Sequence, residues 1–320
     1  MKISSKYNNI LQEPTSMECG LLLYPIKVLE YDYFIKLFSN YLLYDIESLN
    51  RLAKQQHELL ILNGKLSKKT KFKRLREKNI FEYVINQYML DNQIRATSKL
   101  TNEQIEFIKQ GFIVEENIKK EIPKEQINNL MHFIEAVKSK KIKCNNNDKR
   151  IIELISIVTK ANEENIEINQ NEINIRINDK LYILEKYNFD EFRKIIMEQN
   201  LIFMPKIAPD LESQEFLDRN IKNKFGKDEY DLESIIALVA CFNPNLDIKN
   251  TSYYRLKAIF HSFLNILTYD IEHNYRANGC RSEGNKDIQV INLTEHLKIK
   301  DNPYDDIFSI TDLSDVGEVK

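Results

Sequence analysis

The sequence predicts a mainly α-helical protein with one small antiparallel β-hairpin near the middle of the chain. Apolar residues recur at helical spacing over most of the 320 residues. Glycine and proline are scarce, with seven of each, and the chain is rich in Ile, Leu, Lys, Glu and Asn, which favours helices joined by short polar connections. Residues 173–184 instead alternate between apolar and polar side chains, which is typical of strands.

The first half is predicted to be helical after a short extended segment at 21–28. Apolar spacing predicts helices over 30–44, 49–63, 80–91, 102–109 and after Pro123. Ser48 is expected to cap the second of these helices, and Gly64 is expected to end it. Thr101 and Gln104 have the spacing of a capping box at the start of the fourth helix.

The second half is predicted to begin with a helix and a hairpin and to return to helices. These later helices are expected over 150–161, 188–200, 213–225, 232–242 and from 252 to the region before Gly279. The pair Asn178-Asp179 favours a tight turn between two strands, and an earlier strand near residues 166–168 can extend the sheet. Asp231 and Thr251 are expected to cap the last two helices.

The run of asparagines at 144–148 predicts an internal boundary, because consecutive Asn residues favour turns and add nothing to a core. We therefore expect an N-terminal helical domain over 1–144 and a C-terminal α domain over 148–300 that begins with the hairpin. Residues 301–320 contain six acidic side chains, which favours a mobile tail or one that a partner orders.

The composition predicts a soluble protein. Lys and Arg number 46 against 48 Asp and Glu, so no global field points to nucleic acid or to an acidic membrane. Four scattered cysteines without CxxC spacing fit reduced thiols in a cytosol. The N-terminus has no apolar signal segment, and the apolar run at 235–242 is far shorter than the roughly 20 residues that cross a bilayer.

The sequence contains no motif of a nucleotide-binding loop, a serine hydrolase or a zinc protease. His261 and His273 lie twelve residues apart in one predicted helix, and the resulting rise of about 18 Å prevents them from sharing a metal ion. We therefore expect no catalytic residue, no cofactor and no metal site, and we do not expect an enzyme.

The last predicted helix is the candidate protein interface. Its apolar residues form one stripe, which suits either a core helix or a helix that binds another protein. Aromatic residues beside such a stripe are typical of protein interfaces. The candidate interface residues are Tyr253, Tyr254, Leu256, Phe260, Phe263, Leu267 and Tyr269.

Residues 65–79 form a basic run with eight Lys or Arg and one acidic residue, Glu77. The charge could engage phosphates, and Phe72 could stack on a base; the alternatives are a solvated linker or a contact with the acidic tail. The neutral overall charge argues against nucleic acid as the main partner. The candidate nucleic-acid residues are Lys68, Lys69, Lys71, Lys73, Arg74 and Arg76.

Three stretches, at 21–43, 180–200 and 230–279, resemble proteins encoded in the structural gene modules of tailed phages and prophages of low-GC Gram-positive bacteria. The last stretch is similar to tail assembly chaperones, small helical proteins that hold the tape-measure protein before the tail polymerises. The resemblance implies a phage protein that acts without catalysis in tail or virion assembly, through helix contacts with tail proteins such as the tape-measure protein.

This resemblance leaves two other functions open. The protein could be a permanent virion component, such as a connector or baseplate protein, or a phage protein that binds nucleic acid or interferes with the host. A chaperone would be located in the bacterial host cytoplasm during assembly, whereas a component would be found in the virion. The identity of the partner and the oligomeric state stay open.

Overall fold

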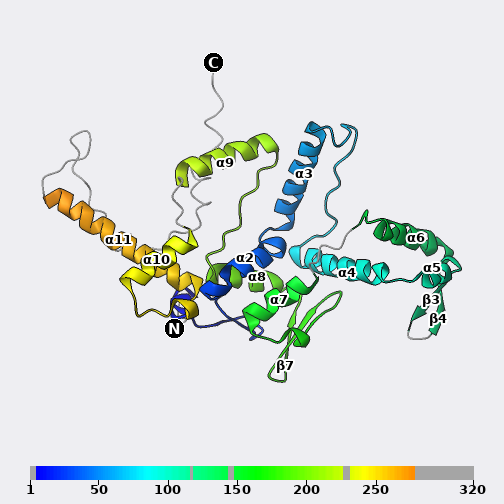
Figure 1. Cartoon of the computed structure of the whole chain (residues 1–320), viewed down its shortest axis with the longest axis horizontal. Coiled ribbons are helices and arrows are strands. Elements are labelled where there is room, and N and C mark those ends of the chain that lie inside the picture. The colour runs from blue at the N-terminus through cyan, green and yellow to red at the C-terminus, as the bar shows by residue number, and fades with distance from the viewer. Residues whose placement is uncertain (1–4, 116–117, 143–147, 226–230, 278–320) are drawn as a thin grey trace, which may run out of the picture. The chain divides into compact units, whose positions relative to one another are not determined.

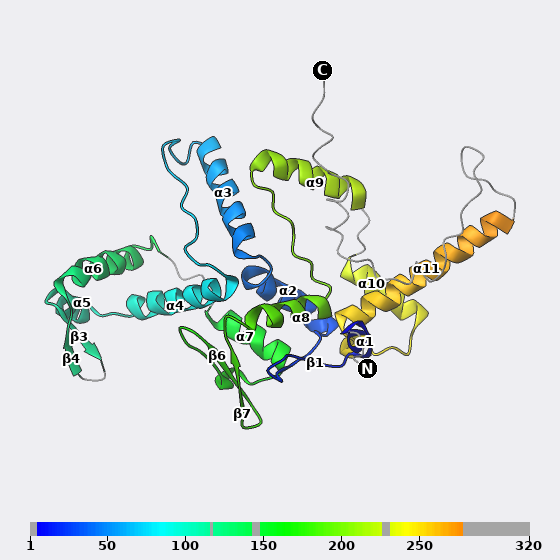
Figure 2. The same ribbon diagram turned by 180° about the vertical axis from the view of Figure 1, so that it is seen from behind.

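The computed structural model describes residues 5–115, 118–142, 148–225 and 231–277 (Figures 1 and 2). These residues form a mainly α-helical fold with three small antiparallel sheets, which confirms the predicted fold class. The α-helices are α1 (Ser5–Leu11), α2 (Val28–Tyr41), α3 (Ile46–Leu62), α4 (Ile80–Ser98), α5 (Asn102–Lys109), α6 (Lys124–Lys138), α7 (Asp148–Thr159), α8 (Phe189–Gln199), α9 (Leu211–Phe225), α10 (Leu232–Phe242) and α11 (Tyr253–Ala277). Two 3-10 helices are η1 (Glu163–Asn165) and η2 (Ile248–Asn250).

The strands pair only with neighbours in the sequence. They are β1 (Thr15–Ser16) with β2 (Leu22–Leu23), β3 (Phe112–Glu115) with β4 (Ile118–Glu121), and the three-stranded sheet of β5 (Ile166–Ile168), β6 (Ile173–Ile177) and β7 (Lys180–Leu184). Every pair is antiparallel. Each sheet therefore forms from local contacts, as expected for antiparallel hairpins.

The chain divides into two compact units, each built from more than one segment of the sequence. Unit 1 comprises the described residues of Met1–Ile80, Ile157–Lys160 and Tyr187–Lys320, and unit 2 comprises those of Phe81–Ser156 and Ala161–Lys186. Residues 144–147 of the predicted boundary and the predicted acidic tail, 301–320, lie outside the described residues.

The three-stranded sheet of unit 2 confirms the predicted hairpin and its third strand. Ile173 and Ile175 on β6 are fully buried, so the alternating pattern places one face of the strand in the core. Asn178 and Asp179 adopt φ angles of 47° and 62° in the two-residue turn. Asn and Asp tolerate this left-handed conformation, which matches the twist of the two strands.

The core of unit 1 contains two aromatic pairs, one on α2 and one on α8. Phe34 and Phe38 on α2 have ring centroids 5.8 Å apart, and Phe189 and Phe192 on α8 have centroids 5.7 Å apart. All four side chains are fully buried. Fully burying such a ring contributes about 1.5–3 kcal/mol to folding, so these two helices supply much of the stability of unit 1.

Two buried amides at the end of α8 hold the N-terminal segment in place. Asn200 accepts a hydrogen bond from the Ile26 N–H through Oδ1 at 3.0 Å and donates from Nδ2 to the Ile196 carbonyl at 2.8 Å. Gln199 donates from Nε2 to the Leu23 carbonyl at 2.9 Å. Buried backbone groups need such partners, and the two amides supply them for Leu23, Ile26 and Ile196.

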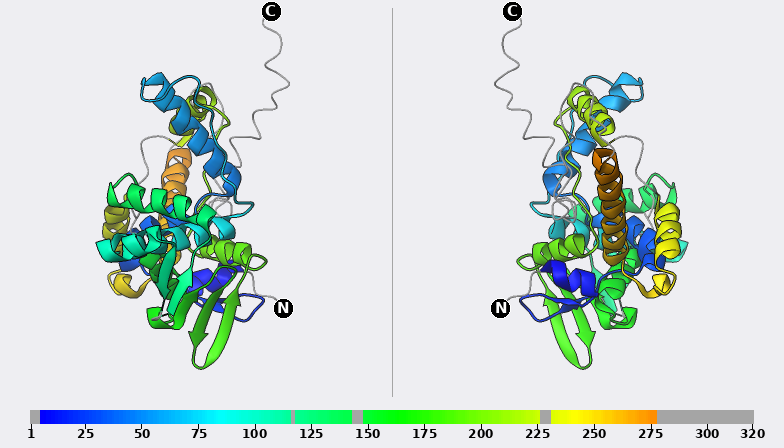
Figure 3. Two further views of the ribbon diagram at one scale, coloured as in Figure 1. Left: turned by 90° about the vertical axis from the view of Figure 1, so that its right-hand side faces the viewer. Right: turned by 90° about the vertical axis from the view of Figure 1, so that its left-hand side faces the viewer.

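A second hydrophobic cluster joins α2, α10 and α11 within unit 1. Its buried members are Val28 on α2, Ile235 and Val239 on α10, and Leu256 and Phe260 on α11; we call them the C-terminal core. Residues four positions apart on α10 and on α11 face the same side, so one stripe of each helix is buried here. α11 is a continuous helix of 25 residues, drawn in orange in Figure 3.

Most local signals at helix ends are where the sequence predicted them. Thr101 and Gln104 form the capping box of α5, and the side chain of Asp231 accepts a hydrogen bond from the backbone of α10. Gly64 follows α3 with a φ of 69°, a left-handed conformation that costs glycine little.

Two predicted caps are wrong. α3 begins three residues earlier than expected, and Asp45 caps it by accepting a hydrogen bond from the Ser48 N–H at 2.7 Å. At α11 the Oγ of Ser252, and not that of Thr251, accepts the bond from the Arg255 N–H. In both places two residues of a type that can cap lie near the helix start, Asp45 and Ser48 at α3 and Thr251 and Ser252 at α11, so composition alone does not select one.

Other elements differ from the prediction as well. The prediction lacked α1 and the β3–β4 hairpin and ended α4 at residue 91, whereas the helix continues to Ser98. α1 has only seven residues, and β4 reads IKKE with a single apolar residue, so neither repeats an apolar pattern long enough to be recognised in the sequence.

The aspartate caps of α9 and α10 predict an acid-sensitive unit 1. Hydrogen bonds from the backbone and hydroxyl of Ser213 hold the pKa of Asp210 below its usual value, and Ser234 does the same for Asp231. A carboxyl group whose pKa is lower in the folded state than its unfolded value of 3.8 stabilises the fold at pH values above 3.8. This stabilisation is lost as the pH falls through the pKa of the folded state. We therefore expect the melting temperature of unit 1 to decrease once the pH is lower than about 4.

The matched variant is Asp210→Asn with Asp231→Asn, because asparagine keeps the capping oxygen and does not titrate. Circular dichroism melts between about pH 5 and pH 3 should show a smaller drop in melting temperature for this variant than for the wild type. An equal drop in both proteins would contradict the role of the two caps.

Candidate functional site

An apolar groove of about 590 Å³ lies in unit 1, between α1, α10 and α11. In Figures 1 and 2, α10 lies beside the first half of α11, and α1 lies close to the start of α11. The apolar side chains that line the groove include Ile10, Leu238, Phe242, Ile259, Phe263 and Ile266. Asn243, Arg255 and Ser262 add polar groups to the wall.

The groove arises because one apolar stripe of α10 both packs on the C-terminal core and borders the groove. Ile235 and Val239 belong to that core, and Val239 also lines the groove together with Leu238 and Phe242. The Phe242 ring stacks on Phe263 of α11, with centroids 3.5 Å apart. Stacked aromatic rings fix the spacing of the two helices and form an apolar wall.

Apolar side chains of the groove lining, and two more farther along α11, are exposed to solvent. Ile10, Phe242, Ile266, Leu267 and Ile271 are each 40–54% exposed. Single exposed apolar residues are ordinary, but a contiguous patch is typical of a surface that binds another molecule. We call the groove lining, together with Leu267 and Ile271, the groove surface.

Three predicted interface residues lie inside the protein. Tyr254, Leu256 and Phe260 are at most 3% exposed, and Leu256 and Phe260 belong to the C-terminal core. Burial raises the pKa of the Tyr254 hydroxyl. Tyr254 and Leu256 are almost fully buried and leave little surface for a partner, whereas Phe260 also lines the groove.

A fourth predicted residue, Tyr253, packs within the chain. Its ring stacks on that of Tyr31 in α2, with centroids 3.5 Å apart, and the Nζ of Lys257 lies 5.8 Å from its centroid. Burial, together with the neighbouring Tyr253, raises the pKa of the Tyr31 hydroxyl. Tyr253 therefore joins α11 to α2.

The remaining three predicted interface residues lie on the outer part of α11. Phe263 lines the groove and Leu267 is exposed, whereas the half-buried Tyr269 ring stacks on His273 with centroids 5.9 Å apart. The prediction missed Ile10 and Ile266. The apolar spacing of α11 could have indicated Ile266, but Ile10 lies on a helix too short to predict.

All six predicted nucleic-acid residues are exposed. They lie on the irregular segment between α3 and α4, where the run of Lys68, Lys69, Lys71, Lys73, Arg74 and Arg76 faces solvent. Phe72 is half-buried, and its ring lies 5.9 Å from the ring of His57 on α3. The ring therefore already packs on α3 instead of standing free.

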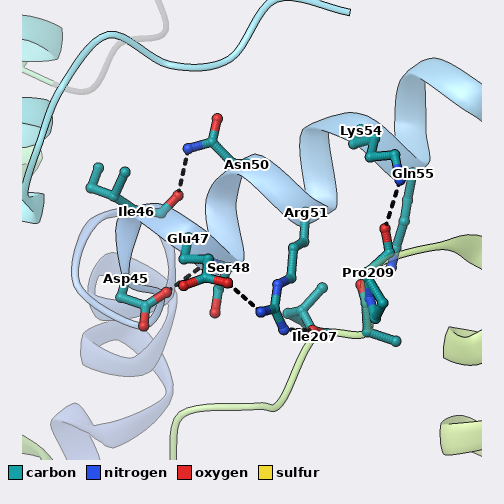
Figure 4. A network of polar contacts seen from close by, with 11 residues as sticks. Asp45, Ile46, Glu47, Ser48, Asn50, Arg51, Lys54, Gln55, Ile207 and Pro209 are labelled. Atoms are coloured by element: carbon teal, nitrogen blue, oxygen red, sulfur yellow. Dashed lines mark hydrogen bonds and ion pairs between the residues drawn. The ribbon is translucent and has the colours of Figure 1, made fainter.

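Helix α3, which carries this segment, is bound on another side to residues 207–210 (Figure 4). Arg51 donates to the Ile207 carbonyl at 2.8 Å, and Lys54 donates to the Pro209 carbonyl at 3.1 Å. Buried Gln55 donates from Nε2 to the carbonyls of Ala208 and Asp210. These bonds hold α3 to residues 207–210 over about one helical turn, from Arg51 to Gln55.

Within the described ranges, no three His, Cys, Asp or Glu side chains are placed to hold a metal ion. No helix in this part of the chain is long and apolar enough to span a membrane.

The chain is similar to the SPbeta prophage-derived uncharacterized protein YomV of Bacillus subtilis (strain 168), with 26% identity over 123 residues. The match covers 38% of this chain and 50% of YomV, so it spans about half the length of that relative. No family model matches the chain, and no solved structure matches it. The comparison supports a relationship to prophage proteins.

Proposed function

We propose that this is a phage protein without catalytic activity, which acts in the assembly of the tail or virion by binding an apolar helix of another structural protein. The groove surface between α1, α10 and α11 carries the proposal, because it is an apolar hollow with exposed apolar residues beside it. The prophage relationship of YomV supports the phage context. The resemblance of residues 230–279 to tail assembly chaperones supports the assembly role.

An amphipathic helix is the occupant that fits this surface. A groove between two helices accepts side chains at positions i, i+3, i+4 and i+7 of a third helix, which buries its apolar face. The polar side chains in the groove wall can contact polar groups of the bound helix and so fix its direction; they are Arg255, Asn243 and Ser262. Covering the groove surface also removes the exposed Phe242, Ile266 and Ile271 from water, which favours binding.

The proposed mechanism is reversible protection. An apolar segment of a tail protein, such as the tape-measure protein, would associate with itself before the tail assembles. Binding in an open groove on one face of unit 1 covers that segment, and the growing tail then displaces the chaperone by covering the same residues.

The test is co-expression of the tagged chain with each structural protein encoded beside it, followed by affinity purification and mass spectrometry. Ile266→Asp places a charge in the groove and should reduce the partner retained at least about tenfold, because a desolvated charge opposes apolar binding. Leu90→Asp is the matched control, since Leu90 is an exposed apolar residue of a helix in unit 2.

Equal retention by both variants would show that the groove is not the binding site. Failure of every structural protein to copurify with the wild type would overturn the proposal itself. Mass spectrometry of purified particles addresses the alternative of a permanent component. A chaperone should be absent from particles, and its presence at stoichiometric amounts would assign the chain to the virion.

A further inference from the structure

The basic segment after α3 is held along that helix by its backbone. The N–H groups of Lys65 and Leu66 donate to the Leu60 carbonyl at 2.9 and 3.1 Å, which turns the chain back at the helix end. Further on, His57 Nε2 donates to the Thr70 carbonyl at 3.0 Å, because a carbonyl can only accept. The segment therefore runs back beside α3, as Figures 1 and 2 show.

A third attachment lies near the far end of the segment. The N–H of Leu75 donates to Oδ1 of Asn50, in the first half of α3, at 2.8 Å. Phe72 and Leu75 are half-buried, and the Phe72 ring packs on His57. The apolar side chains and the bonded backbone groups thus contact α3, while the basic side chains between them are exposed.

The positive charge of the segment is not neutralised by α3. The two glutamates of the helix already have partners, since Glu47 pairs with Arg51 and Glu58 pairs with Lys54. None of the exposed cations at 68, 69, 71, 73, 74 and 76 forms an ion pair within the described ranges. We call these six residues the basic row.

The basic row has the length of a short stretch of nucleic acid. Lys68 and Lys69 lie in a turn that is closed by a hydrogen bond from the Thr70 N–H to the Ser67 carbonyl at 2.9 Å. An extended chain rises about 3.3 Å per residue, so the part from residue 70 to Arg76 can span about 20 Å. One strand of a DNA duplex carries a phosphate every 3.4 Å or so along its axis, and about six nucleotides have the same length.

We propose that the basic row binds the sugar–phosphate backbone of nucleic acid without reading the bases. Four of its six cations are lysines, which act as point charges on phosphates, and the segment has one aromatic ring, Phe72, which already packs on His57. Base stacking therefore contributes little, and counterion release from the phosphates drives binding. The overall charge of −2 does not reflect this local positive charge, because the acidic residues that balance it lie elsewhere in the chain.

The test is fluorescence anisotropy of the full chain with labelled single-stranded and duplex DNA of about 20 nucleotides, longer than the row. If about five phosphates of the single strand are contacted, the affinity should fall about 100-fold between roughly 50 and 200 mM salt. Lys69→Glu with Lys71→Glu and Lys73→Glu should weaken binding at least about tenfold, since each removes an attraction and adds a repulsion.

The matched control is Lys124→Glu with Lys141→Glu and Lys194→Glu. These lysines are also exposed, and the net charge changes by the same amount. Circular dichroism checks that both variants are folded. Equal weakening by the two variants would show a general charge effect and overturn the proposal, as would the absence of binding at low salt.

Poly-glutamate at the same concentration of negative charge serves as a competitor. It should displace DNA poorly; displacement as strong as that by unlabelled DNA would assign the row to an acidic polypeptide and reject the nucleic-acid proposal. The basic row and the groove surface share no residue. The three-lysine variant should therefore retain the copurifying structural protein, and the two proposals can fail separately.

Discussion

Replacing Phe260 by alanine should lower the free energy of unfolding of unit 1 by about 3–5 kcal/mol. The ring is 2% exposed and packs with Val28, Ile235, Val239 and Leu256, which come from three helices. Its removal loses the burial of the ring and leaves a cavity that three helices cannot all move to fill. The loss is large relative to the roughly 5–15 kcal/mol that stabilises most domains.

Urea unfolding is monitored by hydrogen exchange of peptides from α10 and α11. Because these peptides belong to unit 1, the measurement separates this loss of stability from changes in unit 2. Ile266→Ala is the matched control on the same helix, because Ile266 is 48% exposed, and it should cost less than about 1 kcal/mol. Similar losses in the two variants would contradict the view that the buried residues of α11, such as Leu256 and Phe260, stabilise unit 1 more than its exposed residues do.

Replacing Asn200 by alanine should cost about 2–3 kcal/mol, a larger loss than for an ordinary polar residue. Asn200 is fully buried and bonds the Ile26 N–H and the Ile196 carbonyl. Alanine leaves the Ile26 N–H buried without this partner, and the desolvation cost of that group is then no longer offset.

Asn243→Ala is the matched control, because Asn243 follows α10 at the same C-cap position as Asn200 follows α8 but is exposed. It should change the free energy of unfolding by no more than about 0.5 kcal/mol. Urea unfolding measured by circular dichroism compares the two variants. If Asn200→Ala were as mild as its control, the amide would not be what fixes the N-terminal segment.

The sequence predicted the elements of this fold better than the site. Helical periodicity is a local property, and so are the capping box at Thr101 and the turn at Asn178-Asp179. Where two capping residues compete, as Ser252 and Thr251 do before α11, the sequence did not select the residue that bonds the helix. The choice depends on backbone geometry that neighbouring segments impose.

The candidate site was predicted in part. Phe263 and Leu267 belong to the groove surface, but Tyr254 and Leu256 are buried. A helix with a wide apolar stripe does not reveal which part of the stripe its own protein covers. That depends on α2 and α10, whose contacts with α11 come from distant parts of the chain. The basic row was visible in the sequence, whereas its attachment to α3 was not.

By itself, the sequence determined that the chain is helical, where most helices run, and where a basic run lies, because these follow from the spacing of residues within a few turns. The tertiary structure alone decided which apolar faces are buried and which remain open as the groove surface. It also decided that the basic run is attached along α3. The physical reason is that burial and attachment depend on contacts between residues far apart in the chain, and the pattern of one segment does not specify its partner.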